Sequence, residues 1–392
     1  MDLLRARFLA SVRGRKALDT LPDGLASLPL HALASELRKT FPPHEASALA
    51  EQIVLRAGAR EKFGGDASAM LFSQRGLEMM THATVAERRA RRLAALGLPI
   101  VDLTCGLGGD LRAIAATGAW AVGVEVDQAT ALLASVNAPF ASIVHGDASS
   151  SPVSIADRAV VVDPSRRGAA GRRFDPAAFV PNWDICLALL AEARAGVLKT
   201  APGLDHTHIP VGGEAEFVQL GRSMRECAIW LGGDAMPGLR RAVLLPADIE
   251  LTSADPAVDA TEVSPAAFLF DPESCVTRAG LVRQLGHILN ARMMDEQVAY
   301  LASSEPSIHP LAACFELLEA VPFSIARLRN ALRAGRWKPS DIRRRAFPIE
   351  PDELRRLLGP LEGDAVTLLC TTLAGQRTVF IGKKVGPQPP GH

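Results

Sequence analysis

The sequence has no long hydrophobic run, because nowhere do the roughly 18 apolar residues needed for a membrane-crossing helix follow one another. The apolar stretch in its opening segment, MDLLRARFLASVRGRK, is too short and too interrupted for a signal peptide. We therefore expect a cytoplasmic protein with no membrane partner. With 392 residues, 48% of them hydrophobic, the chain can bury the cores of two or three domains.

Cysteine is scarce, and no two cysteines form a C-x-x-C pair. The six are Cys105, Cys186, Cys227, Cys275, Cys314 and Cys370. This spacing favours neither a zinc ribbon nor a disulfide framework, so we expect buried free thiols. His206 and His208 are close enough to share a metal, but no third ligand type stands near them, which favours a polar loop and no metal.

The chain also lacks net charge, but this balance hides a pattern. Residues 1–95 hold 15 basic and 10 acidic residues, and residues 321–392 hold 13 and 6. The middle is acidic, with 8 basic against 13 acidic residues in 96–220 and 7 against 14 in 221–320. A basic end segment is typical of contact with nucleic acid or another polyanion, although a solvated helix face gives the same count.

Periodicity divides the chain into five segments. We expect an N-terminal helical region at 1–95, a Rossmann-like domain at 96–250, a helical connector at 251–320, a small α+β module at 321–385 and a disordered tail at 386–392. The connector is predicted to hold a loop at 251–265 and helices near 279–289 and 294–302. The last module is predicted to hold a basic helix, an extended run, a second helix and a hairpin.

Short β-rich runs alternating with helical ones predict the fold class, α/β with a largely parallel sheet of about seven strands. The runs lie at 99–104, 120–126, 141–145, 158–163, 196–200, 214–220, 226–231 and 241–246. The segment at 110–118 supplies the first crossover helix, which Gly118 ends.

A glycine-rich turn follows the first run, in VDLTCGLGGD at 101–110. A NAD fingerprint would need G-x-G-x-x-G, but Leu111 stands at its third glycine position. Asp102, placed before Gly106 and Gly108, favours S-adenosylmethionine (SAM), because its carboxylate can reach the methionine ammonium. The two glycines let the backbone approach the ligand closely.

Two more acids lie at or just after the ends of the next two β-rich runs. Glu125 can accept both ribose hydroxyls, and Asp147 can accept from the adenine amino group. Three acids in order behind successive strands favour a SAM site over ordinary strand-end residues. With their neighbours and the acid that follows the fourth run, the predicted cofactor residues are Asp102, Cys105, Gly106, Gly108, Glu125, Val126, Asp147, Ala148 and Asp163.

The fourth run ends in DPSRR at 163–167, at the edge where open parallel sheets bind ligands. Asp163, Pro164 and Arg166 are the predicted catalytic residues. Enzymes that methylate base amino groups often have D/N-P-P-Y/F here, so the acceptor atom stays open. Phe174 or Trp183 is a candidate for the missing aromatic, and Lys199 is equally well a site residue or a strand-end cation. A proline turn with solvated arginines is the alternative for the whole motif.

With these residues assembled, the chain resembles class I SAM-dependent methyltransferases, and more narrowly a bacterial group with a C-terminal THUMP-like domain. The matching stretches are FSQRGLEMMTHATVAERRARRL (72–93), DLTCGLGGD (102–110), DPSRR (163–167), KTAPGLD (199–205) and FLFDPESCVTRAGL (268–281). The glycine motif also looks like that of trimethylguanosine synthases, whose D/N-P-P-W element is absent. The resemblance implies SAM as cofactor and suggests RNA as substrate.

The sequence therefore predicts a SAM-dependent methyltransferase that modifies RNA by direct transfer, with no nucleophilic cysteine after the fifth run. A small-molecule or protein methyltransferase and a non-catalytic RNA-binding protein on the same fold are the alternatives. The predicted RNA-binding residues are Arg327, Arg329, Arg333, Arg336, Arg343, Arg344 and Arg345. The sequence does not indicate an oligomeric state.

Overall fold

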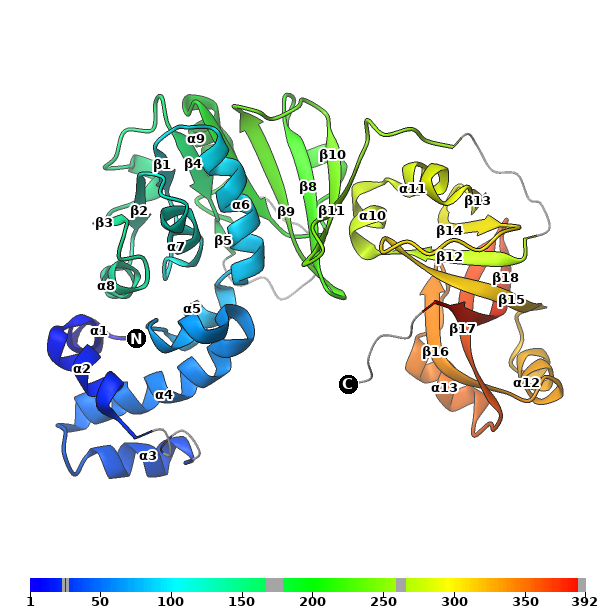
Figure 1. Cartoon of the computed structure of the whole chain (residues 1–392), viewed down its shortest axis with the longest axis horizontal. Coiled ribbons are helices and arrows are strands. Elements are labelled where there is room, and N and C mark those ends of the chain that lie inside the picture. Colours follow the sequence, from blue (N-terminus) through cyan, green and yellow to red (C-terminus); the bar gives the residue numbers. More distant parts are fainter. Residues whose placement is uncertain (23–24, 26–27, 167–178, 259–265, 387–392) are drawn as a thin grey trace. The chain divides into compact units, whose positions relative to one another are not determined.

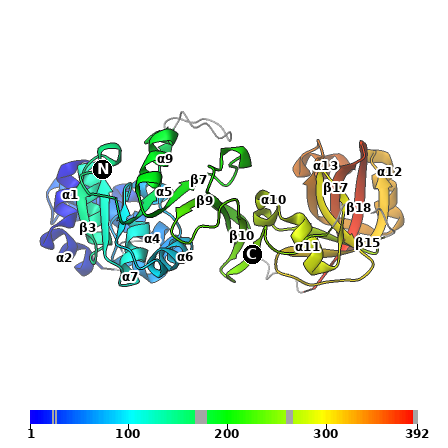
Figure 2. The same ribbon diagram turned by 90° about the horizontal axis from the view of Figure 1, so that it is seen from above.

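The computed structural model describes residues 1–22, 25, 28–166, 179–258 and 266–386. The chain forms two compact units (Figures 1 and 2). The first comprises Met1–Ala215 and Arg225–Gly238, and the second Glu216–Met224 and Leu239–His392. No helix among the described residues is both long and apolar enough to cross a membrane.

Helices make up the N-terminal region, as the sequence predicts. They are α1 (Leu3–Ala10), α2 (Val12–Thr20), α3 (Leu30–Leu37), α4 (Pro43–Phe63), α5 (Gln74–Met79) and α6 (Ala83–Ala95), with a 3-10 turn at Gly64–Ser68. Asp2 and Ser11 cap α1 and α2 by accepting from backbone amides, and Pro43 opens α4 where its missing N–H costs nothing. Figure 1 shows these helices, blue to cyan, grouped beside the sheet of the first unit.

Two buried amide side chains hold the segment before α5, and one of them, Asn137, also ties this region to the rest of the first unit. Asn137, at the end of α8 (Gln128–Asn137), accepts from the Leu71 amide at 2.7 Å and donates to the carbonyls of Leu71 and Leu107, both at 2.8 Å. Gln52 on α4 bonds both backbone groups of Phe72. The backbone N–H and C=O groups of the segment before α5 are therefore hydrogen-bonded to these two side chains, much as a strand's backbone is bonded to a neighbouring strand.

The large sheet has nine strands in the order β11-β10-β8-β9-β7-β4-β1-β2-β3. They are β1 (Ile100–Asp102), β2 (Ala121–Glu125), β3 (Ser142–His145), β4 (Ala159–Val162), β7 (Ala195–Thr200), β8 (Glu214–Leu220), β9 (Ser223–Gly232), β10 (Arg240–Leu245) and β11 (Ile249–Thr252). The five strands from β7 to β3 are parallel, and β9 joins β7 antiparallel. The α/β class is confirmed, with helices α7 (Gly109–Ala116), α8 and α9 (Trp183–Glu192) as crossovers.

The strand count is higher than the predicted seven. All eight β-rich runs form strands, and a ninth, β11, begins before the predicted loop at 251–265. A turn at 246–248 folds it back on β10, so backbone pairing and not sequence alternation makes it a strand. Residues 259–265 of that loop lie outside the described residues.

The second sheet has seven strands in the order β13-β14-β12-β15-β18-β17-β16. They are β12 (Phe268–Pro272), β13 (Arg292–Asp295), β14 (Val298–Ser303), β15 (Ala312–Pro322), β16 (Trp337–Arg345), β17 (Asp364–Leu373) and β18 (Gln376–Val385). Helices α10 (Ser274–Ala279), α11 (Val282–Leu289), α12 (Ile325–Ala334) and α13 (Pro351–Leu358) complete the unit. The basic helix, extended run, second helix and hairpin predicted after residue 321 are confirmed; residues 387–392 of the predicted tail lie outside the described residues.

The predicted helix at 294–302 is wrong, because β13 and β14 form a hairpin there. Met294, Val298 and Leu301 have helical spacing, which produced the error. Asp295 instead accepts from the Gln297 amide at 2.8 Å and closes a turn, and β14 pairs with β12. The segment 251–320 is thus not a helical connector, since four strands that begin within it belong to the C-terminal sheet.

Candidate cofactor and acceptor site

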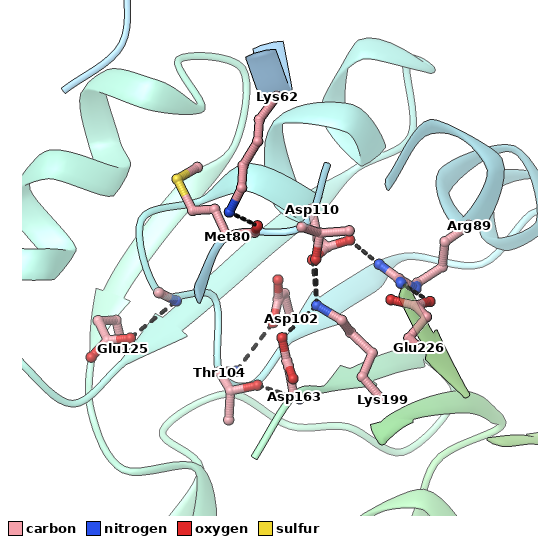
Figure 3. Close-up of polar contacts among 12 residues, drawn as sticks. Lys62, Met80, Arg89, Asp102, Thr104, Asp110, Glu125, Asp163, Lys199 and Glu226 are labelled. Atoms are coloured by element: carbon pink, nitrogen blue, oxygen red, sulfur yellow. Dashed lines mark hydrogen bonds and ion pairs between the residues drawn. The ribbon is translucent and has the colours of Figure 1, made fainter. Parts of the chain in front are cut away.

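The five parallel strands place the predicted acids along one edge of the large sheet. Asp102 ends β1, Glu125 ends β2, Asp147 follows β3 and Asp163 follows β4. Parallel strands share the direction of their carboxyl ends, so all four face the edge where open α/β sheets bind ligands. Lys199, near the end of β7, joins them (Figure 3).

The turn between β1 and α7 (residues 103–108, the glycine turn) needs its glycines for their backbone conformation. Gly106 has φ +53° and Gly108 has φ +81°, a region that side-chain-bearing residues rarely adopt. A Cβ on Gly106 would meet nothing within 4 Å, so the space above it is open. Cys105, by contrast, is buried, and burial raises the pKa of its thiol well above the usual value.

Glu125 organises the glycine turn from the neighbouring strand. One carboxylate oxygen accepts from the Gly106 amide at 3.0 Å, and the other accepts from the Asp127 amide at 2.8 Å (Figure 3). Burial raises the pKa of Glu125, and these amides oppose that effect. Each carboxylate oxygen has a second lone pair. Both oxygens can therefore accept a hydroxyl from a bound ligand without giving up the backbone amides.

Asp102 is buried with few groups around it that stabilise a negative charge. The residue is 2% exposed, and the Thr104 amide donates to Oδ1 at 3.1 Å. Among the described residues no cation is paired with it. Burial, followed by the charge of Asp110, raises the pKa of Asp102 to about 7. A cationic ligand group beside Asp102 would stabilise its ionised form.

The remaining predicted cofactor residues lie at the outer strands. Asp147 is exposed and accepts from the Ser149 amide at 2.7 Å, which fixes its direction at the end of β3. Ala148 is buried behind it, and Val126 is 65% exposed beside Glu125. An exposed apolar side chain next to an acid is suited to contact with a flat ring such as adenine.

A chain of buried ion pairs runs behind this edge. It links Glu226 on β9, Arg89 on α6, Asp110 on α7, Lys199 on β7 and Asp163, in that order (Figure 3). We refer to these five residues as the ion-pair chain. Thr81 donates to Asp110 at 2.9 Å and accepts from Lys199 at 2.6 Å.

The charges in the ion-pair chain alternate, and this stabilises its inner members. Burial alone would raise the pKa of Asp110, but Arg89 and Lys199 outweigh it and hold that pKa well below its usual value. Burial alone would lower the pKa of Lys199, but Asp110 and Asp163 outweigh it and raise that pKa. With Asp102 included, four acids surround two cations. The site thus carries an excess of negative charge, which suits a cationic ligand.

Asp163 is the exposed end of the ion-pair chain. Its side chain is 40% exposed, whereas that of Lys199 is 7% exposed. The Asp163 amide donates to the Thr104 hydroxyl of the glycine turn at 2.6 Å. Pro164 is buried, and the backbone of Ser165–Arg166 forms a short strand, β5, paired with β6 (Phe179–Val180).

Of the two candidates for the aromatic platform, Trp183 lies within the described residues. It is buried at 8% exposure, with its ring centroid 5.8 Å from that of Phe179. Phe174 and Arg167 lie outside the described residues.

Four of the seven predicted RNA-binding arginines already have partners within the second unit. Arg343 and Arg345 both bind Asp271, Arg344 binds Glu350, and Arg329 donates to the carbonyls of Leu357 and Leu358. The other three, Arg327, Arg333 and Arg336, are exposed on or just after α12. The sequence predicted one role for all seven arginines, whereas the structure divides them into four with partners in the protein and three that are exposed.

Several residues of the site escaped the sequence reasoning. They are Thr81, Arg89, Thr104, Asp110 and Glu226, and Lys199 was left undecided. A signal for Arg89 existed: Val85, Ala86, Ala90 and Leu93 define the buried face of α6, and Arg89 falls on that same face. An arginine among apolar residues at helical spacing indicates a buried partner.

Comparison with known proteins gives relatives for both units. A family model described as THUMP domain-like matches residues 312–384. Two curated relatives from Mycobacterium tuberculosis, strains CDC 1551/Oshkosh and ATCC 25618/H37Rv, are uncharacterized S-adenosylmethionine-dependent methyltransferases. Each is 34% identical over 305 residues, 73% of this chain and 81% of theirs. A solved structure of a candidate methyltransferase from Porphyromonas gingivalis W83 aligns over 98% of both chains, with a TM-score of 0.73 and 21% identity.

Proposed function

Because this chain belongs to the class I SAM-dependent methyltransferases that carry a C-terminal THUMP-like domain, we propose that it methylates RNA by direct transfer of the methyl group. SAM is the cofactor of the family and supplies the methyl group as a sulfonium. The excess of buried acids beside the glycine turn fits such a cationic group. The observation that carries the proposal is the position of Asp163, exposed itself but tied to the glycine turn through Thr104.

The residues at the sheet edge divide the work between two ligands. We assign Asp102 to the methionine ammonium, Glu125 to the ribose hydroxyls and Asp147 to the adenine amine, with the Gly106 and Gly108 backbone close to the cofactor. Asp163 accepts a hydrogen bond from the attacking group and orients it. Most of the catalytic contribution is then positioning of two reactants in line.

Direct transfer is favoured over a covalent enzyme intermediate by the state of the thiols. All six cysteines are free and buried, as the sequence predicts. Cys105, the one in the glycine turn, has a raised pKa and is therefore a poor nucleophile at neutral pH. The segment after β7, residues 201–209, contains no cysteine.

The choice of RNA rests on the second unit. Its THUMP-like match suggests RNA, since such domains accompany RNA-modifying enzymes. The three exposed arginines, Arg327, Arg333 and Arg336, are available for phosphates. Such contacts would tether the substrate without reading its sequence, leaving the choice of atom to the catalytic unit.

The test is transfer of a radiolabelled methyl group from SAM to total RNA, followed by digestion to nucleosides. We expect a labelled nucleoside with the wild type and none with Asp163→Asn. The matched control is Asp66→Asn, which removes an exposed acid paired with Arg112 elsewhere in the same unit. Label found in protein or in small molecules, and not in RNA, would show that this fraction contains the substrate. SAM binding with no transfer to any fraction would indicate a non-catalytic binding protein.

A further inference from the structure

The buried ammonium of Lys199 has an acceptor for each of its three N–H groups. Nζ lies 2.6 Å from Thr81 Oγ1 and 2.9 Å from Asp110 Oδ2, and it pairs with Asp163 Oδ2 (Figure 3). An ammonium has three donors, so this set is complete. A saturated, buried ammonium cannot move without losing hydrogen bonds that water does not replace.

The two carboxylates that share this ammonium belong to different parts of the site. Asp110 lies in the first turn of α7, directly after the glycine turn. Asp163 follows β4 and faces solvent. Lys199 therefore connects the element that begins at the cofactor turn with the residue assigned to the methyl acceptor.

The surroundings of Asp163 make a cation there necessary. The charged groups around the Lys199 ammonium are Asp102, Asp110, Asp163, Glu226 and Arg89. Four carboxylates so close cannot all stay ionised beside one arginine, and the surplus would be neutralised by bound protons. A protonated carboxyl donates a hydrogen bond, whereas an ionised one only accepts.

We propose that Lys199 is a positioning residue for methyl transfer: its ammonium balances the acids around it and fixes the Asp163 carboxylate beside the glycine turn, leaving Asp163 Oδ1 to accept from the attacking group. This proposal rests on the proposed function and restricts the class of methyl acceptor. The acceptor must carry a hydrogen on the attacking atom, as an amine or hydroxyl does.

The first test needs no RNA. SAM is titrated into the full-length protein at pH 7 in two buffers of different ionisation enthalpy, which gives the number of protons released on binding. Without Lys199 the ligand-free acids bind extra protons, which the cationic cofactor then displaces. Lys199→Met should therefore release about one proton more than the wild type.

The matched control for this test is Lys62→Met. Lys62 is a half-buried lysine whose ammonium donates to the backbone carbonyls of Leu77, Glu78 and Met80, so its three hydrogen-bond acceptors are not carboxylates. Its variant should release the wild-type number of protons. A wild-type number in Lys199→Met as well would overturn the proposal, because Lys199 would then not hold the acids ionised.

The second test is methyl transfer to total RNA. Lys199→Met should lower kcat by about 100-fold or more, with KM for SAM changed by less than about threefold. The acid limb of its pH profile should move to higher pH, which a merely structural role would not cause. An unmoved limb, or a full rate, would contradict the proposal. If the wild type labels no RNA, the RNA assignment fails while the proton count still decides the role of Lys199.

A third measurement covers the case in which Lys199→Met folds but is too unstable for the first two tests. Adding Asp163→Asn removes one of the carboxylates left without its cation. The double variant should then have a higher Tm than Lys199→Met alone. An equal or lower Tm would show that the two side chains do not act on each other, and would overturn the proposal.

Discussion

The two units each contain a charge cluster, and the two clusters differ in their balance of charge. In the first unit, two cations, Arg89 and Lys199, lie among four acids, namely Asp102 and the three acids of the ion-pair chain. In the second, Asp271 bridges Arg343 and Arg345, and Arg343 also pairs with Asp341, so that two acids balance two arginines. Those two arginines lie over aromatic rings, at 5.2 Å from the centroid of Phe315 and 5.5 Å from that of Tyr300.

The difference indicates which cluster is suited to a charged ligand. A surplus of buried acid is relieved by a bound cation, whereas arginines that already pair with acids do not need a ligand to balance their charge. The aromatic rings stabilise the arginines of the second unit further, because a guanidinium over a ring face is favourable. We therefore expect the acidic cluster to respond to ligand and pH, and the Asp271 cluster to act mainly as structure.

The largest expected effect is on catalysis in the acidic cluster. Asp163→Ala should lower the rate of methyl transfer by about 100- to 1000-fold, since it removes the hydrogen-bond acceptor for the attacking group. SAM affinity, measured by calorimetry, should stay nearly unchanged. A parallel loss of affinity and rate would move Asp163 into the cofactor site. Asp66→Ala serves as the control and should retain full activity.

Asp102→Asn should stabilise the ligand-free protein while weakening SAM binding. The folded pKa of Asp102 is about 7, and an unfolded aspartate has a pKa of about 3.9. The folded state thus binds more protons between these values, so stability falls as pH rises from about 4 to 7. Asparagine does not titrate, so the variant avoids that loss. Its free energy of unfolding should exceed that of the wild type by about 2–4 kcal/mol at pH 8 and by little at pH 4.

The check on Asp102 is urea unfolding of the wild type and the variant at pH 4 and pH 8. Asp66→Asn, which changes an exposed acid, should show no such pH dependence. The same gain at both pH values would mean that the asparagine acts through packing and that Asp102 is ionised in the ligand-free protein.

Glu125→Ala should weaken SAM binding by about 1.5–3 kcal/mol, the scale for a lost charged acceptor. The alanine also leaves the Gly106 amide without its partner, so the glycine turn loses part of its support. Calorimetry with SAM measures the change. Unaltered affinity would place the ribose contact elsewhere along the edge.

The smallest expected effects are on RNA affinity in the second unit. Alanine at Arg327, Arg333 or Arg336 should each lower the salt slope of RNA binding by about 0.7, the value for one phosphate contact to single-stranded RNA. Arg343→Ala should leave that slope unchanged and lower the Tm, because it breaks the Asp271 cluster. A larger change in the salt slope for Arg343→Ala than for Arg333→Ala would mean that Arg343 contacts RNA and that Arg333 does not.

Much of the fold follows from local sequence signals. Eight β-rich runs and the main helices lie where periodicity places them, because each element buries its own apolar face. The errors come from pairing between distant residues. The segment around Val298 has helical spacing but becomes a strand because β12 is available as a partner, and no local pattern reveals that partner.

The candidate site divides in the same way. The acids at the ends of β1, β2 and β4 are predictable because strand order places them at one edge. Arg89 and Glu226 are 137 residues apart in the chain, and only the packing of α6 against β9 brings them together. Asp110 stood in the quoted glycine motif, but its partners Thr81 and Lys199 come from elements on either side of it in sequence.

The amide clamps of Asn137 and Gln52 bear on how this protein can be divided for study. A fragment that begins near residue 96, where the sheet starts, would leave the Asn137 side chain without Leu71, with which it makes two of its three hydrogen bonds. It would also lose Arg89 and Thr81, so Asp110 would keep only Lys199. Proteolysis or truncation at that boundary should therefore yield an aggregating fragment, whereas a cut before Pro43 leaves both clamps in place.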